Sequence, residues 1–169
     1  LVVAAAGNGE DAPTKPWPYA SYPAAFPHVL GVAAYGRSGN VPTFSNRDKQ
    51  YVDLAAPGMD IFSLFPKALT ARFAGCVEQG YSICGTSDFR HADGTSFAAA
   101  QVSGLVALLR QVSPRIAPSK VHDALAARPA LGSAAARPLP IDACAAFARA
   151  GPGCACGCRL ADAQETPRH

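Results

Sequence analysis

A serine at the start of a long apolar segment is the residue in this chain best suited to chemistry. Ser96 follows Gly94 and Thr95 and precedes a run of apolar residues that predicts a helix. A hydroxyl at a helix N-terminus lies beside unpaired backbone N–H groups and the positive end of the helix dipole, and both stabilise developing negative charge. Ser96 therefore has the position of a nucleophile, although a Thr95 or Ser96 that merely caps the helix fits the same pattern.

Asn8 is the second residue with a position suited to catalysis. It follows residues 1–7, which are apolar or small throughout and predict a short buried strand. A side-chain amide held at the end of such a strand is a neutral donor that can stabilise an oxyanion. The alternative is a turn residue, because Gly7, Asn8 and Gly9 form a natural chain reversal.

Residues 94–104, Gly-Thr-Ser-Phe-Ala-Ala-Ala-Gln-Val-Ser-Gly, resemble the nucleophile motif of the subtilisin-like serine peptidases, or subtilases. The departures are Ala100, where the family usually has proline, and Gln101, which replaces the commoner histidine; neither position performs chemistry in the family. Residues 22–34, 44–46 and 53–58 are similar to further family blocks in the same order, so the resemblance covers residues 1 to about 148.

The resemblance implies that Ser96 is the nucleophile and that Asn8 donates to the oxyanion of the tetrahedral intermediate. Loss of one such donor costs about 3–4 kcal/mol of transition-state stabilisation in subtilisin, itself a member of this family. The Asp and His of the family's triad precede the serine, with the histidine well over 100 residues before it, so we expect both upstream of this chain. The chain then corresponds to the C-terminal half of a catalytic domain.

No histidine of the chain is an evident substitute for the missing base. His91 lies five residues before Ser96, within possible reach, but is better explained as a surface loop histidine. Asp88 and Asp93 beside it fit solvated turn residues. The remaining histidines are His28, His122 and His169.

The elements that must position these residues indicate an α/β fold. The sequence predicts buried strands over residues 1–8, 29–35 and 59–64, a long helix over about 96–112 and a second helix over 119–128. Ser119 is the expected cap of the second helix, with Val121 and Leu125 facing inward. The long helix is apolar nearly all round, which predicts burial, and Gly104 is expected to permit close packing on the sheet.

The expected architecture is a three-layer, parallel-sheet subtilisin-like fold that is incomplete because its N-terminal half is absent. Residues 1–150 form the C-terminal part of the catalytic domain, and residues 151–169 form a Cys- and Gly-rich irregular tail. One flank of the sheet would be uncovered, so we expect the chain alone to be poorly soluble or partly unfolded.

Composition narrows the classes of partner. The formal charge of +3 is too small and scattered to indicate nucleic acid or an anionic membrane. No apolar run approaches the roughly 20 residues that span a bilayer. The expected partners are a peptide or protein substrate and the N-terminal remainder of the domain.

Cysteine usage suggests an oxidising compartment. Cys76 and Cys84 bracket a seven-residue loop before the nucleophile segment, where a disulfide is plausible. Four more cysteines gather near the C-terminal end, with spacing that suits disulfides better than the usual zinc site: Cys144, Cys154, Cys156 and Cys158. If oxidised, these residues imply a secreted or periplasmic protein.

The resemblance also bears on substrate and ion binding. It places Ala5, Ala6 and Gly7 along one wall of the primary specificity pocket and Ser21 near its floor, where small residues suit an apolar or aromatic side chain. No cofactor is required. Calcium is possible as a structural ion, held by carbonyls of residues 24–29 and by Asp53.

The sequence thus predicts a serine endopeptidase of the subtilase family whose isolated chain lacks a complete triad. The alternative is an inactive, truncated or degenerate fragment that binds peptides or partners without cleaving them. A lipase-type or esterase-type hydrolase is disfavoured because Gly-x-Ser-x-Gly does not occur around Ser96.

Overall fold

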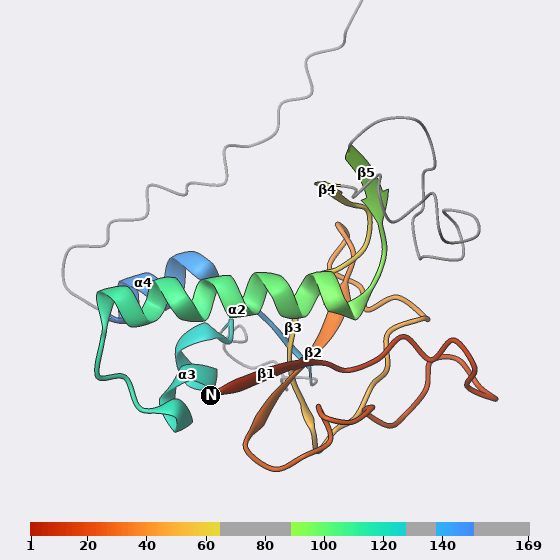
Figure 1. The fold of residues 1–169 in the computed structure, drawn as a ribbon, viewed down its shortest axis with the longest axis horizontal. Helices are drawn as coiled ribbons and strands as arrows, with labels where there is room; N and C mark the ends of the chain where they lie inside the picture. The colour runs from red at the N-terminus through yellow and green to blue at the C-terminus, as the bar shows by residue number, and fades with distance from the viewer. Residues whose placement is uncertain (65–88, 128–137, 151–169) are drawn as a thin grey trace, which may run out of the picture.

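A four-stranded parallel sheet forms the centre of the computed structural model, which describes residues 1–64, 89–127 and 138–150. The strands run in the order β1 (Val2–Ala5), β2 (Val29–Tyr35), β3 (Val52–Pro57) and β6 (Leu139–Pro140). β1 therefore lies at an edge of the sheet as described (Figure 1). The predicted α/β class is confirmed, as is the strand over residues 29–35; the first strand is shorter than expected.

Hydrophobic residues bury both faces of this sheet. Leu30, Val32 and Ala34 of β2 belong to the larger core cluster, whereas Ala33 belongs to a second cluster on the opposite face. This alternation is what a central parallel strand requires. The second cluster is covered by Ala20, from the irregular chain between β1 and β2, so the described helices all pack on the first face.

The helix α2 (Thr95–Val112) crosses the first face of the sheet, and its buried side chains face the larger cluster (Figure 1). The prediction of this helix is confirmed, but the prediction that it is buried all round is wrong. Its outer face is exposed, including 52% of Leu108. Gly104 is exposed too, and a Cβ there would have no neighbour within 4 Å among the described residues, so this glycine does not serve close packing on the described sheet.

A two-stranded antiparallel ribbon leads into α2. It consists of β4 (Ile61–Leu64) and β5 (Phe89–Ala92), and it stands at the end of the molecule where α2 begins (Figure 1). β4 falls within the predicted strand over residues 59–64. His91 lies on β5 and pairs with Phe62 of β4, so the expectation of a loop histidine is wrong.

Two short helices complete the first face at the other end of α2. They are α3 (Pro118–Leu125) and α4 (Ala143–Ala150). Val121 and Leu125 are fully buried, as predicted. The helix ends earlier than expected, however, and Ser119 does not cap it: the N-cap is Ala117, without a side-chain hydrogen bond.

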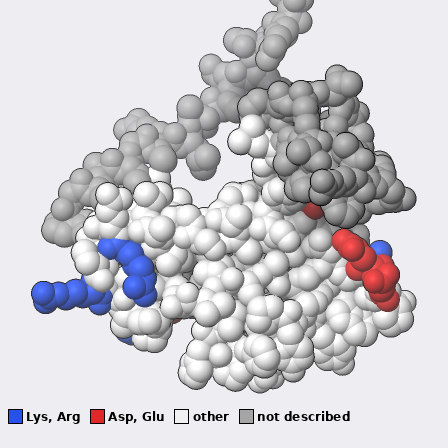
Figure 2. Space-filling model, viewed as in Figure 1, with Lys and Arg blue, Asp and Glu red and all other residues white. Residues whose placement is uncertain are grey.

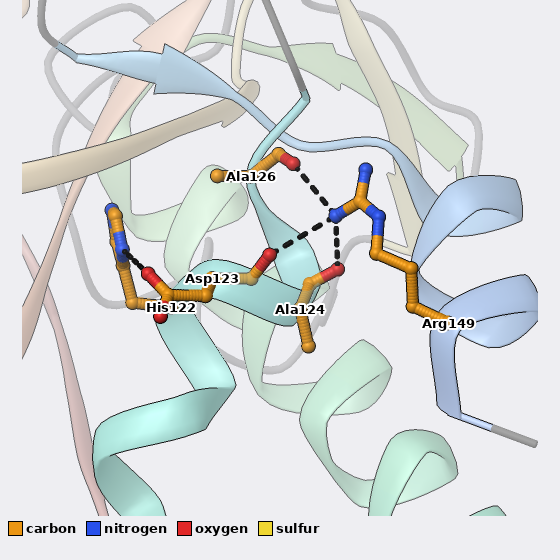
Figure 3. A network of polar contacts seen from close by, with 5 residues as sticks. All are labelled: His122, Asp123, Ala124, Ala126 and Arg149. Carbon is orange, nitrogen blue, oxygen red and sulfur yellow. Dashed lines mark hydrogen bonds and ion pairs between the residues drawn. The ribbon is translucent and has the colours of Figure 1, made fainter.

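Arg149 of α4 joins these two helices (Figure 3). Its Nη1 donates to the carbonyl oxygens of Asp123, Ala124 and Ala126 at distances of 3.0, 2.9 and 3.0 Å. The last carbonyls of a helix have no intrahelical donor, and a cation suits the negative end of the helix dipole. The guanidinium therefore fixes the C-terminal end of α3 against α4.

Candidate active site

Ser96 occupies the first turn of α2 and is exposed. The N-cap is Gly94, which has no side chain, so neither Thr95 nor Ser96 has the capping role that was the alternative. Gly94 has φ 156°, a conformation that side-chain-bearing residues rarely adopt. Its N–H donates to the carbonyl of Gly58 at 2.8 Å, which fixes the start of α2 to the end of β3.

Asn8 and the start of α2 are joined by hydrogen bonds through Thr95. The Oδ1 of Asn8 accepts from the backbone N–H of Thr95 at 3.0 Å and from the Thr95 hydroxyl at 2.9 Å. The same hydroxyl accepts from the N–H of Gly7 at 3.2 Å. Thr95 is only 1% exposed, so these bonds are shielded from water. The end of β1 is thereby fixed beside the residue that precedes Ser96.

These contacts also determine which way the Asn8 amide faces. With Oδ1 directed at Thr95, the Nδ2 group points to the other side, where it donates a long hydrogen bond of 3.4 Å to Glu10. The position of a Cβ on Gly94 would lie 3.5 Å from this Nδ2. The donor nitrogen is therefore near the turn that delivers Ser96, and sequence reasoning missed that Thr95 orients it.

The described histidines do not supply a base to Ser96. His91 Nδ1 lies 2.6 Å from Asp60 Oδ1, and Asp93 accepts from the Asp60 N–H at 2.6 Å. His122 Nδ1 lies 3.2 Å from Asp123 Oδ1 on α3, and His28 is exposed ahead of β2. None of these three is hydrogen-bonded to the Ser96 hydroxyl, whereas His169 and Asp88 lie outside the described residues.

Asn46 holds the chain around the predicted specificity residues together. Its Nδ2 donates to the carbonyl of Ala6 and to the hydroxyl of Ser21, both at 3.1 Å. A Cβ on Gly7 would lie only 2.5 Å from this Nδ2, so the close approach requires glycine. Ala6 is fully buried and Ala5 is half-buried in β1. Residues 44–46 resemble a family block, and that resemblance is the signal that could have identified Asn46.

A pocket of about 480 Å³ opens beside Asn8. Ser21 and Asn46 line it together with the turn that follows Asn8, which includes Gly9, Glu10 and Asp11. The lining thus combines polar and acidic residues with the apolar side chains of Ala12, Pro13 and Trp17. Ser21 lines this pocket, whereas Ala6 is packed in the second core cluster; their roles in substrate binding stay predictions.

The described residues give little support to a metal site. Among them there is no group of three or more His, Cys, Asp or Glu side chains that could hold an ion. Asp53 is half-buried on β3, and the carbonyl of Phe26, in the segment expected to bind calcium, already accepts from the Val29 N–H. A site built mainly from backbone carbonyls does not need such a group, so calcium binding remains a proposal that rests on the resemblance.

The cysteines are mostly beyond the described residues. Cys76, Cys84, Cys154, Cys156 and Cys158 all lie outside that part of the chain. Cys144, on α4, is half-buried and is a free thiol in the part of the chain that the structure describes.

Comparison with known proteins identifies the family to which this chain belongs. The model of the Subtilase family matches residues 1–135. The chain belongs to the subtilase family. It is 34% identical over 128 residues to fervidolysin of Fervidobacterium pennivorans, and 34% identical over 110 residues to the major intracellular serine protease of Bacillus subtilis. These matches cover 74% and 65% of the chain.

Solved subtilase structures share the fold. The crystal structure of fervidolysin, described as a keratinolytic enzyme related to subtilisin, superposes with a TM-score of 0.66 at 30% identity over 90% of the chain. A protease of Pseudoalteromonas arctica gives a TM-score of 0.63 at 27% identity over 89% of the chain. The described architecture is therefore the subtilase fold.

The chain spans only part of these relatives. It covers 17% of fervidolysin and 28% of the Bacillus subtilis protease, and 23% and 43% of the two solved chains. The names of the relatives include an extracellular basic protease of Dichelobacter nodosus as well as intracellular proteases, so they do not assign this subtilase to one compartment. No helix among the described residues has the length and apolar character to cross a membrane.

Proposed function

We propose that this subtilase chain supplies the nucleophile and the oxyanion donor of a serine endopeptidase. The observation that supports the proposal is the orientation of the Asn8 amide. Two bonds from Thr95 hold its oxygen, and its NH2 group lies near the start of α2, where Ser96 is exposed, with a long bond to Glu10 that leaves its second N–H to donate. A preorganised neutral donor beside a nucleophile is what stabilisation of a tetrahedral oxyanion requires.

In the proposed reaction the Ser96 oxygen attacks the carbonyl carbon of the scissile peptide bond. The carbonyl oxygen becomes an oxyanion, which accepts hydrogen bonds from Asn8 Nδ2 and from the backbone N–H of Ser96 in the first helical turn. A base takes the Ser96 proton and passes it to the leaving amine, which leaves an acyl-enzyme on Ser96. Water then releases the acyl group by the same steps.

We propose that the base and its orienting acid are a histidine and an aspartate outside residues 1–169. The described histidines are held by other groups or placed elsewhere, with His91 bound to Asp60. The relatives are also several-fold longer than the matched region, as fervidolysin illustrates. This chain then acts as one half of a site that a second segment completes.

Labelling with a fluorophosphonate probe tests the proposal. We expect strong labelling of the wild-type chain only when an upstream half that carries the histidine and aspartate is supplied, and none of Ser96→Ala in either condition. Strong labelling of the chain alone would place the base within it. Absence of labelling in both conditions would favour the non-catalytic fragment.

Secretion or a periplasmic location, and calcium as a structural ion, are further proposals that rest on the cysteines and on the family resemblance. Titration of thiols under denaturing conditions addresses the first. Six reactive thiols would remove the argument for an oxidising compartment, because all six cysteines of the chain would then be reduced.

A further inference from the structure

The pocket beside Asn8 includes acidic side chains in its lining. Of the residues that line it, the two with full charges are Glu10 and Asp11, and both are acidic and exposed. Glu10 also accepts the long hydrogen bond from Asn8 Nδ2. The pocket is thus continuous with the proposed oxyanion donor, and a substrate residue that enters it lies beside the carbonyl that Ser96 would attack.

A buried acceptor without a donor adds to the negative character of this pocket. Asn46 is 1% exposed, and its Nδ2 donates to two oxygens, which fixes the orientation of the amide. Its Oδ1 has no hydrogen-bond partner among the described residues. A Cβ on Gly9 would lie 2.8 Å from Oδ1, so this oxygen is directed at the pocket wall that Gly9 forms. The negative end of an amide dipole is thus fixed behind this wall, without a donor to neutralise it, and it favours a cation in the pocket.

The distribution of charged side chains on one face of the molecule is consistent with an acidic pocket. Figure 2 shows acidic side chains gathered at the end of the molecule where α2 begins, whereas most of the basic side chains in view lie at the opposite end. An acidic surface around a polar pocket attracts cations and repels carboxylates.

We infer that the pocket beside Asn8 binds a positively charged side chain, Lys or Arg, of the substrate residue on the acyl side of the scissile bond. This inference rests on the proposed function. Ammonium and guanidinium groups are donors only, so they can pair with the exposed carboxylates of Glu10 and Asp11 at the pocket. The preference differs from the apolar or aromatic one that the small residues Ala5, Ala6 and Gly7 suggest in the sequence.

Trp17 provides a direct readout, because it lines this pocket and is the single tryptophan of the chain. The probes are Nα-acetyl-arginine amide and Nα-acetyl-citrulline amide, which have nearly the same shape but differ in charge. Their binding is followed by Trp17 fluorescence in the domain completed by an upstream half from which tryptophan has been removed. We expect the arginine derivative to bind about five- to tenfold more tightly, as two partly exposed ion pairs allow.

Charge variants show whether the two carboxylates cause the difference. The double variant Glu10→Gln with Asp11→Asn is expected to bind both probes equally, whereas the matched control Asp123→Asn, an exposed acid on α3, keeps the wild-type preference. Equal binding of the two probes to the wild type would overturn the inference, as would a preference that survives the double variant.

Two further arms distinguish a cationic side-chain pocket from a metal site and from failure of the proposed function. Calcium chloride that produces the same fluorescence change and displaces the arginine derivative at equal concentration would make the pocket a metal site and overturn the inference. Fluorophosphonate labelling of Ser96 in the same preparation, with the upstream half supplied, reports on the proposed function alone. Labelling without a preference for arginine rejects only the pocket's specificity, and a preference without labelling rejects only the peptidase.

Discussion

Thr95 binds Asn8 through two atoms, and both bonds end on the same amide oxygen. An asparagine amide offers an acceptor at one end and a donor at the other, so a protein that fills the acceptor end determines where the donor points. Thr95 is therefore a positioning residue: it acts on the proposed oxyanion through Asn8. The Thr95 hydroxyl also accepts a hydrogen bond from the Gly7 N–H, which holds the end of β1 beside the start of α2.

The variant Thr95→Val tests this positioning role in a protein that carries the whole catalytic domain. It keeps the shape and the backbone N–H but removes the hydroxyl, so we expect kcat to fall about ten- to hundredfold with little change in KM. Thr95→Ser restores the hydroxyl and is expected to keep most of the activity. A Thr95→Val enzyme with the wild-type kcat would show that the hydroxyl does not orient Asn8.

Tyr35 gives a prediction about pH. Burial at the end of β2 raises the pKa of its phenol above the ordinary value of 10.0. Between about pH 10 and the raised pKa, the folded state retains the phenolic proton that the unfolded state has lost. The stability contributed by Tyr35 is therefore present below about pH 10 and is lost as the pH rises beyond it. Urea unfolding at about pH 9 and about pH 11 is expected to show a smaller loss of stability for Tyr35→Phe than for the wild type. Tyr19→Phe, at a residue that is 60% exposed, serves as the control and should leave the loss unchanged.

Among the elements, α2 contributes to both the larger core cluster and the candidate active site. Its inner face contributes Val102 and Leu109 to the core, and Gln101 donates to the carbonyl of Pro57 at 2.6 Å. That contact and the bond from Gly94 to Gly58 fix the first two turns of the helix at the end of β3.

Gly104 on the outer face of α2 allows a test at the scale of the helix. Because the space around it is open, Gly104→Ala adds a better helix former without a clash, and we expect the chain to gain about 1 kcal/mol in its free energy of unfolding. The matched control Ala107→Gly, at another exposed position of α2, should lose a similar amount. Destabilisation by Gly104→Ala, measured by urea unfolding, would show that this face is closely packed.

The elements also show what could be predicted from the sequence and what could not. The strand over residues 29–35 and the helix from about 96 to 112 follow from long apolar patterns, and both were predicted nearly to the residue. The burial of α2 was overestimated, because apolar periodicity does not reveal which face lacks a covering layer. The bonds of Thr95 to Asn8, 87 residues apart in sequence, depend on tertiary contacts that local patterns do not contain.

At the scale of the whole molecule, the uncovered surfaces belong to β1 and α2, the two elements that position Asn8 and Ser96. β1 is at an edge of the described sheet, with Leu1 46% and Val2 55% exposed, and the outer face of α2 is exposed as well. An open strand edge and an apolar surface favour association with other chains. The subtilase relatives extend well beyond the matched region, so a further segment of the domain is the partner we expect to cover these surfaces.

Light scattering and thermal unfolding test this expectation. The isolated chain is expected to self-associate or to unfold over a broad temperature range, and addition of an upstream half should give a single species with a sharper transition. A monodisperse monomer with a cooperative transition in the isolated chain would argue against an incomplete domain.

The central claim is that the Ser96 hydroxyl and the Asn8 amide act on the same carbonyl group. The most direct measurement is the NMR signal of the Asn8 side-chain amide, labelled with ¹⁵N, before and after a fluorophosphonate forms an adduct on Ser96 in the completed domain. Asn40, which is exposed, provides the reference signal. We predict a downfield shift of the Asn8 amide protons as they bind the phosphonyl oxygen, with Asn40 unchanged. An adduct on Ser96 that leaves the Asn8 signal where it was would contradict the claim.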